Sequence, residues 1–187
     1  GCCWLPEGEI VAVVQIVHGI TEYALRYEEF ARYLNGLGYL VVAQDHMGHG
    51  GSVEDGLFGY FYGGWSAAVA DTYELLLQTR KQYPALPYIL IGHSMGSFIV
   101  RTILCDHPNS GISGAILTGS GWFSKGLMMI GAAYAGLLPQ KKPSKLILHA
   151  AFGTGNRRIP NPKSPYEWVC RDEAVAKAFA EDPLCHF

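Results

Sequence analysis

Residues 88–101 read YILIGHSMGSFIVR and place a serine between two glycines. The apolar residues 88–91 predict a buried strand, and the apolar residues after Gly96 predict a helix. Gly92-x-Ser94-x-Gly96 at a strand-to-helix junction is the pattern of the nucleophile elbow, a tight turn that presents a serine at the carboxyl edge of a sheet. Small residues are needed on both sides because strand and helix pass close to such a turn. The pattern predicts that Ser94 is a nucleophile rather than an ordinary turn serine.

Buried strands and helical patterns alternate on both sides of this stretch. Four short runs are almost wholly apolar and are expected to be strands: residues 10–17, 39–43, 88–91 and 112–117. Strands that alternate with helices at this spacing predict an α/β protein with a doubly wound, mostly parallel sheet. Residues 122–187 carry helical patterns and loops but no strand pattern. We therefore expect a partial sheet core in residues 1–121 and a helical cap, or lid, over the sheet in residues 122–187.

The composition excludes several classes of protein. A chain that is 49% hydrophobic and 16% charged is typical of a folded globular protein. A net charge of -2 does not indicate a basic surface for nucleic acid or a polybasic membrane anchor. No apolar run reaches the roughly 18 residues of a membrane span. The five cysteines are odd in number and irregular in spacing, which predicts reduced thiols in a cytoplasmic protein.

Two backbone N–H groups are candidates for an oxyanion hole beside Ser94. Met95 opens the helix after the serine, so its N–H and the helix dipole are directed at charge that develops there. The second donor is expected from the loop after the first predicted strand, His18-Gly19-Ile20, with the N–H of Ile20 as the candidate. This chemistry requires no cofactor.

Three stretches resemble α/β-hydrolases of the monoacylglycerol lipase and lysophospholipase type, a serine aminopeptidase S33-like family. They read VVQIVHGITEYALRYEEFARYLNGLGYLVVAQDHMGHGGS, ILIGHSMGSFIVR and SPYEWVCRDEAVAKAFAEDPLCHF, in the family's order and over nearly the whole chain. The resemblance implies an α/β-hydrolase fold with a helical cap. It also implies an ester hydrolase for lipids with a single acyl chain, with Ser94 as the nucleophile and Ile20 and Met95 as backbone donors.

Other candidate sites have plainer interpretations. His46 and His49 could be imagined as metal ligands, but no carboxylate or cysteine at ligand spacing joins them, and the resembled family carries this loop without metal. No metal site is expected, and a structural hydrogen bond is expected for His18. The apolar run 126–138 is interpreted as cap core, as an acyl-chain groove, or as a surface for transient membrane or micelle contact.

The acid and base that should follow Ser94 are harder to find. This fold has the chain order Ser, Asp or Glu, then His. Asp106 and His107 lie at the far end of the elbow helix, about 18 Å away at about 1.5 Å per residue. The remaining candidates fall in the expected cap: His149, Asp172, Asp182 and His186. In the resembled family the catalytic Asp and His follow a stretch like residues 182–185, so we expect a fragment that begins after the first strands of the sheet and stops before its own acid and base.

Three functional hypotheses remain open. The leading one is a truncated serine hydrolase that forms an acyl-enzyme on Ser94 with a small-molecule acyl ester, and that is inactive as this fragment. The second is a peptidase or small-ester esterase on the same fold, because specificity resides in the cap. The third is a non-catalytic lipid-binding module that lacks the triad. An Asp and a His after further strands downstream would support the first two, and a natural stop at Phe187 would support the third.

Overall fold

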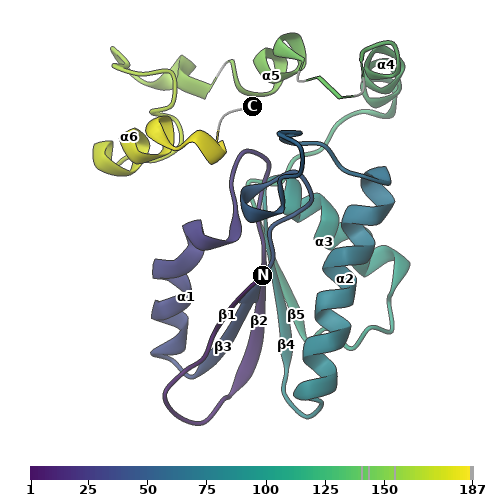
Figure 1. Cartoon of the computed structure of the whole chain (residues 1–187), viewed down its shortest axis with the longest axis vertical. Coiled ribbons are helices and arrows are strands. Elements are labelled where there is room, and N and C mark those ends of the chain that lie inside the picture. Colours follow the sequence, from purple (N-terminus) through teal and green to yellow (C-terminus); the bar gives the residue numbers. More distant parts are fainter. Residues whose placement is uncertain (140, 143, 154, 186–187) are drawn as a thin grey trace. The chain divides into compact units, whose positions relative to one another are not determined.

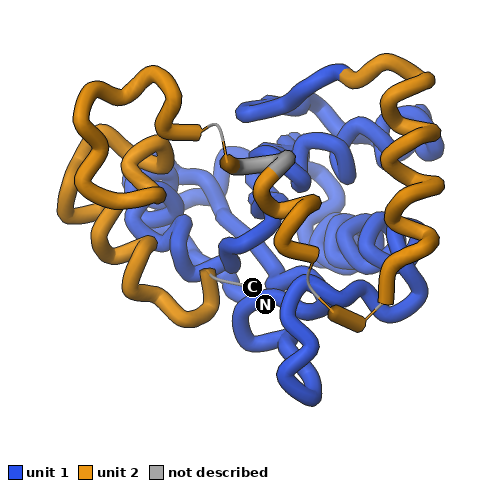
Figure 2. Tube along the Cα trace, turned by 90° about the horizontal axis from the view of Figure 1, so that it is seen from above, with its two compact units in different colours: residues 1–122 blue, residues 123–187 orange. Residues whose placement is uncertain are grey.

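The computed structural model of the chain describes residues 1–139, 141–142, 144–153 and 155–185. The contacts divide the chain into two units, residues 1–122 and residues 123–187, which Figure 2 shows in different colours. Each unit is described by itself below.

The first unit is built on a five-stranded sheet with the order β1-β3-β2-β4-β5 (Figure 1). Its strands are β1 (Cys2–Trp4), β2 (Ala12–Val17), β3 (Tyr39–Ala43), β4 (Tyr88–His93) and β5 (Gly114–Thr118). The last four are parallel, and β1 pairs with β3 in the antiparallel sense. The predicted α/β fold with a mostly parallel sheet is confirmed. β1 was not predicted, because three residues are too few to form a readable pattern.

In the first unit, helices lie between successive parallel strands along the chain. In the second unit, the helices all follow β5. In the first unit they are η1 (Ala24–Tyr27), α1 (Glu28–Asn35), η2 (Gly50–Ser52), α2 (Gly64–Gln82) and α3 (Met95–Asp106). In the second unit they are α4 (Lys125–Gly136), α5 (Lys145–Phe152), η3 (Gly155–Arg158), α6 (Glu173–Glu181) and η4 (Pro183–Cys185). None of the described helices is long and apolar enough to cross a bilayer.

Helices cover both faces of the inner strands of the sheet, and the alternation of side chains along β2 shows how. All six residues of β2 are buried. Val13 and Val17 pack in a cluster with residues of α2 and α3, whereas Val14 and Ile16 pack in a second cluster with residues of η1 and α1. Figure 1 shows the same division, with α1 on one side of the sheet and α2 and α3 on the other. A strand buried on both faces has to be apolar almost throughout, which is why the β2 sequence is a continuous apolar run.

Gln15 is the polar exception in the middle of β2, and its hydrogen bonds explain how it is tolerated. Its Nε2 donates to the Thr72 carbonyl of α2 at 2.9 Å, and its Oε1 accepts from the Tyr88 hydroxyl of β4 at 2.7 Å. The Gln15 amide is buried and has hydrogen bonds at both ends. A shift of β2 by one residue would turn this amide to the other face of the sheet and leave it without these partners, so the amide fixes which face of β2 meets α2.

The strand order creates a switch point at β2. The chain passes from β2 to β3 on one side through α1, then crosses through α2 to β4 on the other side of β2. The carboxyl ends of β2 and β4 are therefore neighbours, and the segments that leave them go to opposite faces. Open α/β sheets bind ligands in the crevice at such a point.

β5 differs from the inner strands in exposure. In the part of the chain that the structure describes, β5 pairs with β4 alone. Residues 115–118 are all exposed, and Ile116 is 52% exposed. The apolar sequence of β5 therefore lies at an edge of this unit that leaves it largely uncovered.

The α-helices α4, α5 and α6 of the second unit begin at side-chain caps. Ser124 and Ser144 accept hydrogen bonds from the backbone three residues further on, at the starts of α4 and α5. Asp172 does the same for α6, where its carboxylate accepts from the N–H groups of Ala174 and Val175. The described residues of this unit form helices and loops. Their role as a lid stays a prediction.

Candidate active site

Ser94 occupies the turn between β4 and α3 in a strained conformation. Its backbone has φ 50° and ψ -118°, whereas residues other than glycine rarely adopt a positive φ. Such a residue costs about 1–3 kcal/mol and persists only where its surroundings fix it. The Ser94 N–H donates to the Thr118 carbonyl at 2.9 Å, and the Ser94 carbonyl accepts from the Ser97 N–H at 3.0 Å and the Ser97 hydroxyl at 2.6 Å. Both peptide groups of the serine are thus held in place.

The two glycines of the motif are required by close backbone contacts. A Cβ on Gly96 would lie 2.0 Å from the carbonyl oxygen of Val17 and 2.6 Å from that of His18. A Cβ on Gly92 would lie 2.7 Å from the Gly96 oxygen. The first turn of α3 therefore rests directly on the end of β2, as the strand–glycine–helix pattern predicts.

The loop after β2 lies beside the serine. An ideal Cβ on Gly19 would be 3.0 Å from the Cβ of Ser94. Ile20 follows Gly19 directly, and Met95 is the first residue of α3, where N–H groups have no preceding carbonyl to bind. Both predicted oxyanion donors therefore belong to the two turns that meet at Ser94. Their role as donors stays a prediction.

Two carboxylates that the sequence analysis missed hold these loops. Glu22 Oε1 accepts from the Gly19 N–H at 2.5 Å and from the Tyr27 hydroxyl at 3.0 Å. The two carboxylate oxygens of Asp45 accept from the backbone N–H groups of Ala24 and Gly51, each at 2.8 Å. An acidic residue three positions after a loop glycine was the available signal for Glu22. Nothing in the local sequence indicates the pairing of Asp45 with Ala24.

Three buried histidines lie beneath the same loops. The ring centroids of His18 and His46 are 4.2 Å apart, and those of His18 and His49 are 5.4 Å apart. His46 donates its backbone N–H to His18 Nε2 at 3.0 Å, and its ring Nε2 lies 3.2 Å from the His18 carbonyl. His49 Nδ1 lies 2.9 Å from the Met47 carbonyl. The structural hydrogen bond expected for His18 is confirmed.

Burial keeps these imidazoles neutral. It lowers the pKa of His18 well below its ordinary value, with a further contribution from the neighbouring His46. It also lowers the pKa of His46 to about 4, assisted by His49 and opposed by the hydrogen bond to the His18 carbonyl and by Asp45. The pKa of His49 is lowered by burial as well. No group of three His, Cys, Asp or Glu among the described residues could hold a metal ion.

The comparisons with known proteins agree with this geometry. A family model described as serine aminopeptidase S33 matches residues 8–187. The chain belongs to this family of α/β-hydrolases. The relationship proposed from the three sequence stretches is thus confirmed.

The relatives of this S33 chain include lipases and an esterase. It is 38% identical to human monoglyceride lipase over 105 residues, which are 56% of this chain and 34% of the human protein. It is 30% identical over 191 aligned residues to the monoacylglycerol lipase of Mycolicibacterium smegmatis, covering 98% of this chain and 59% of that one. A thermostable carboxyl esterase from Bacillus coagulans, solved in complex with glycerol, matches with a TM-score of 0.84 and 32% identity over 99% of this chain and 61% of its own. The chain thus spans between a third and about three fifths of these relatives.

In the first unit of the S33 chain, the Ser94 hydroxyl has no hydrogen-bonded base. No hydrogen bond within residues 1–122 involves the Ser94 hydroxyl. His93 instead places Nδ1 2.9 Å from the Thr118 hydroxyl, so its ring is directed at β5 rather than at the Ser94 hydroxyl. His107 is the C-cap residue of α3, and its ring stacks on that of Tyr73 with the ring centroids 3.8 Å apart.

The acid and base candidates of the second unit have structural partners, lie within a helix, or fall outside the described residues. Asp172 caps α6, and Asp182 accepts from the Leu184 N–H at 2.9 Å. His149 lies in α5. His186 lies outside the described residues. The absence of an acid and a base from this chain stays a prediction.

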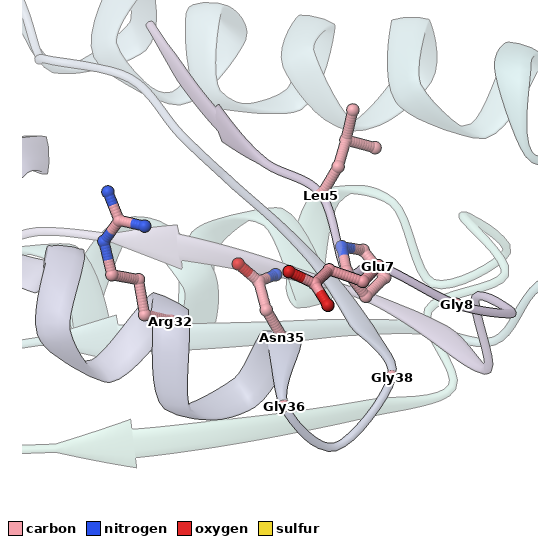
Figure 3. Close-up of a pocket in the computed structure, with 8 residues that line it drawn as sticks. Leu5, Glu7, Gly8, Arg32, Asn35, Gly36 and Gly38 are labelled. Atoms are coloured by element: carbon pink, nitrogen blue, oxygen red, sulfur yellow. The ribbon is translucent and has the colours of Figure 1, made fainter.

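A surface hollow of about 480 Å³ lies at the opposite edge of the sheet, near the amino ends of β2 and β3 (Figure 3). It is lined by the loop before β2 and by the end of α1. Two of its polar side chains are engaged in the fold itself, since Arg32 pairs with Glu28 at 2.6 Å and Asn35 Nδ2 donates to the Tyr39 carbonyl at 2.8 Å. It is therefore not a continuation of the site at Ser94.

Helix α4 covers most of the apolar run 126–138 and buries none of its residues. Ile130 is 70% exposed and Met129 is 64% exposed. Their role in the core of the cap stays a prediction. Their contact with an acyl chain or a lipid surface stays a prediction.

We predict opposite effects for alanine at two glycines that are each the second residue of a helix. Gly96→Ala should cost more than about 2 kcal/mol in the free energy of unfolding, because its Cβ would collide with two backbone oxygens. Gly126→Ala meets nothing within 4 Å and should be neutral or stabilising by up to about 1 kcal/mol. Urea unfolding followed by near-UV circular dichroism measures both, and equal free energies for the two variants would contradict the elbow.

We predict that acid destabilises the protein through His46. Its pKa is lowered from 6.5 to about 4 in the folded state, so the unfolded chain binds the proton first. Stability present above pH 6.5 is therefore lost as the pH falls toward 4, by about 3 kcal/mol for this residue. His46→Gln should reduce the slope of unfolding free energy against pH by up to about 1.4 kcal/mol per pH unit in this window. Parallel slopes for the wild type and the variant, measured by urea unfolding at several pH values, would rule this out.

Proposed function

We propose that Ser94 is the nucleophile of a carboxylic ester hydrolase that acts on lipids with a single acyl chain, monoacylglycerol or lysophospholipid. The observation that carries the proposal is the strained backbone of Ser94, φ 50°, at the carboxyl edge of β4 and beside the Gly19 loop. Strain of this kind is kept where it positions a reactive group. The similarity to monoglyceride lipases supports the substrate class.

The geometry suggests a two-step mechanism. The Ser94 hydroxyl loses its proton to a general base as its oxygen attacks the ester carbonyl carbon, and the carbonyl oxygen becomes an oxyanion. The N–H groups of Ile20 and Met95 donate to that oxyanion. The C–O bond to the alcohol then breaks, and the alcohol leaves with a proton from the conjugate acid of the base. This alcohol is glycerol for a monoacylglycerol and the deacylated glycerophosphodiester for a lysophospholipid. Water attacks the acyl-enzyme in the same way and releases the fatty acid and Ser94.

The proton acceptor is proposed to come from polypeptide outside these 187 residues. Within residues 1–122 no histidine or carboxylate binds the Ser94 hydroxyl, and the relatives that match are longer than this chain. The 187-residue chain by itself is therefore proposed to be inactive as an esterase. A serine without an adjacent base is a weak nucleophile.

Two other functions use the same fold. A small-ester esterase is favoured by the 32% identity to the Bacillus coagulans carboxyl esterase. A peptidase is suggested by the description of the family model. A non-catalytic lipid-binding module gives no reason for a strained serine beside the two proposed oxyanion donors, which makes it the weakest of the alternatives.

We predict that a fluorophosphonate probe labels Ser94 slowly in the 187-residue chain and rapidly in a longer polypeptide that supplies the acid and base. Intact mass spectrometry and peptide mapping measure the rate and the site. Ser94→Ala should abolish labelling, whereas Ser52→Ala, which changes an exposed serine in η2, should leave it unchanged. Equal rates in the two polypeptides would show that the base lies within this chain.

Turnover by the longer polypeptide then distinguishes the substrates. Monoacylglycerol or lysophospholipid should be cleaved in preference to a short-chain ester and to an aminoacyl amide. Preference for the short-chain ester or the amide would replace the proposed substrate by one of the alternatives. Lipid binding without Ser94-dependent turnover would favour the non-catalytic module.

A further inference from the structure

We propose that His18 is a positioning residue, whose neutral imidazole in the Nδ1–H tautomer orients the peptide between Gly19 and Ile20 so that the Ile20 N–H faces the reacting position beside Ser94. The inference rests on the function proposed for Ser94 and Ile20, and it assigns the group that aims the second donor.

The hydrogen bonds of His18 fix its tautomer. The backbone N–H of His46 donates to His18 Nε2 at 3.0 Å, so Nε2 must carry a lone pair and no proton. The proton of the neutral ring is therefore on Nδ1, and Nδ1–H donates to the Gly19 carbonyl at 2.7 Å. His18 is fully buried, so solvent cannot replace either partner. Both ring nitrogens are used, and neither can act as the base for Ser94.

The bond to the Gly19 carbonyl determines where the next N–H points. The chain contains no cis peptide bond among its described residues, and in a trans peptide the N–H points opposite to the C=O. The Gly19 carbonyl is directed at the buried ring of His18. The Ile20 N–H is therefore directed away from that ring. Ser94 lies against this loop, since an ideal Cβ on Gly19 would be 3.0 Å from the Ser94 Cβ.

The other polar backbone groups of the loop are already occupied. The His18 carbonyl accepts from His46 Nε2–H at 3.2 Å, and the Gly19 N–H donates to Glu22 at 2.5 Å. The Ile20 N–H, by contrast, has no acceptor among residues 1–122. The loop is thus held at the His18 carbonyl, the Gly19 N–H and the Gly19 carbonyl, and the next polar group, the Ile20 N–H, has no partner in this unit. Such a preorganised donor suits an oxyanion.

Two substitutions separate the bonds that His18 makes. His18→Asn keeps an amide donor near the position of Nδ1 and loses the acceptor for His46. His18→Gln keeps an acceptor near the position of Nε2 and loses the donor to Gly19. His49→Asn is the matched control, because His49 is also fully buried and its Nδ1 also binds a nearby carbonyl, that of Met47, on a loop that carries no proposed donor.

The first measurement is long-range ¹H–¹⁵N NMR of the 187-residue chain. We expect His18 in the Nδ1–H form, with the Ile20 amide shifted in His18→Gln and close to wild type in His18→Asn. The second is the rate of Ser94 phosphonylation by a fluorophosphonate, in which charge also develops on an oxygen beside Ile20. We expect a loss of about tenfold to a hundredfold in His18→Gln, since removing an oxyanion donor outright costs about 10²–10³. His18→Asn and His49→Asn should stay within about threefold of the wild type.

The outcomes separate this proposal from the proposed function. An Nε2–H tautomer at His18, or full phosphonylation of a folded His18→Gln, would overturn the role of His18 while leaving Ser94 as the nucleophile. Equal losses in His18→Gln, His18→Asn and His49→Asn would show a general structural effect and would also overturn it. If Ser94 is phosphonylated neither in the wild-type 187-residue chain nor in the longer polypeptide that supplies the acid and base, the proposed function is overturned.

Discussion

The rest of the site depends on one close approach, that of the first turn of α3 to the end of β2. A Cβ at Gly96 would lie 2.0 Å from the Val17 oxygen, so the two backbones touch with no side chain between them. Because β2 leads directly into the His18 loop, this approach brings the loop to Ser94. The switch in strand order at β2 supplies the two neighbouring carboxyl ends that make the approach feasible. The positions of Ser94 and of the His18 loop are therefore two consequences of one packing contact.

A polar layer of neutral histidines supports that contact from beneath. His18 and His46 each use a ring nitrogen and a backbone group to bind the other, which joins the loop after β2 to the loop after β3. Such a network is stabilising only while every ring stays uncharged, because protonated His18 would present a donor to the His46 N–H. Precision at the loop is thus obtained at the expense of stability in acid.

The parts of this arrangement that depend on local pattern could be predicted from the sequence. The apolar runs of β2, β3 and β4 predicted a parallel sheet, and Gly92-x-Ser94-x-Gly96 predicted the turn. β1 escaped prediction because three residues in an antiparallel edge leave no pattern. The tautomer of His18 and the contact of Glu22 with Gly19 also escaped it, since they depend on which loops the fold brings together. The interpretation of residues 122–187 as a lid remains a prediction, as does the absence of a catalytic acid and base from this chain.

The measurement that tests the account most directly is a crystal structure of the protein phosphonylated at Ser94. The account predicts that Ser94 keeps a positive φ near 50°. It also predicts that the phosphoryl oxygen lies about 2.7–3.1 Å from the backbone nitrogens of both Ile20 and Met95. A phosphoryl oxygen directed away from both nitrogens, or a Ser94 that relaxes to a negative φ, would contradict it.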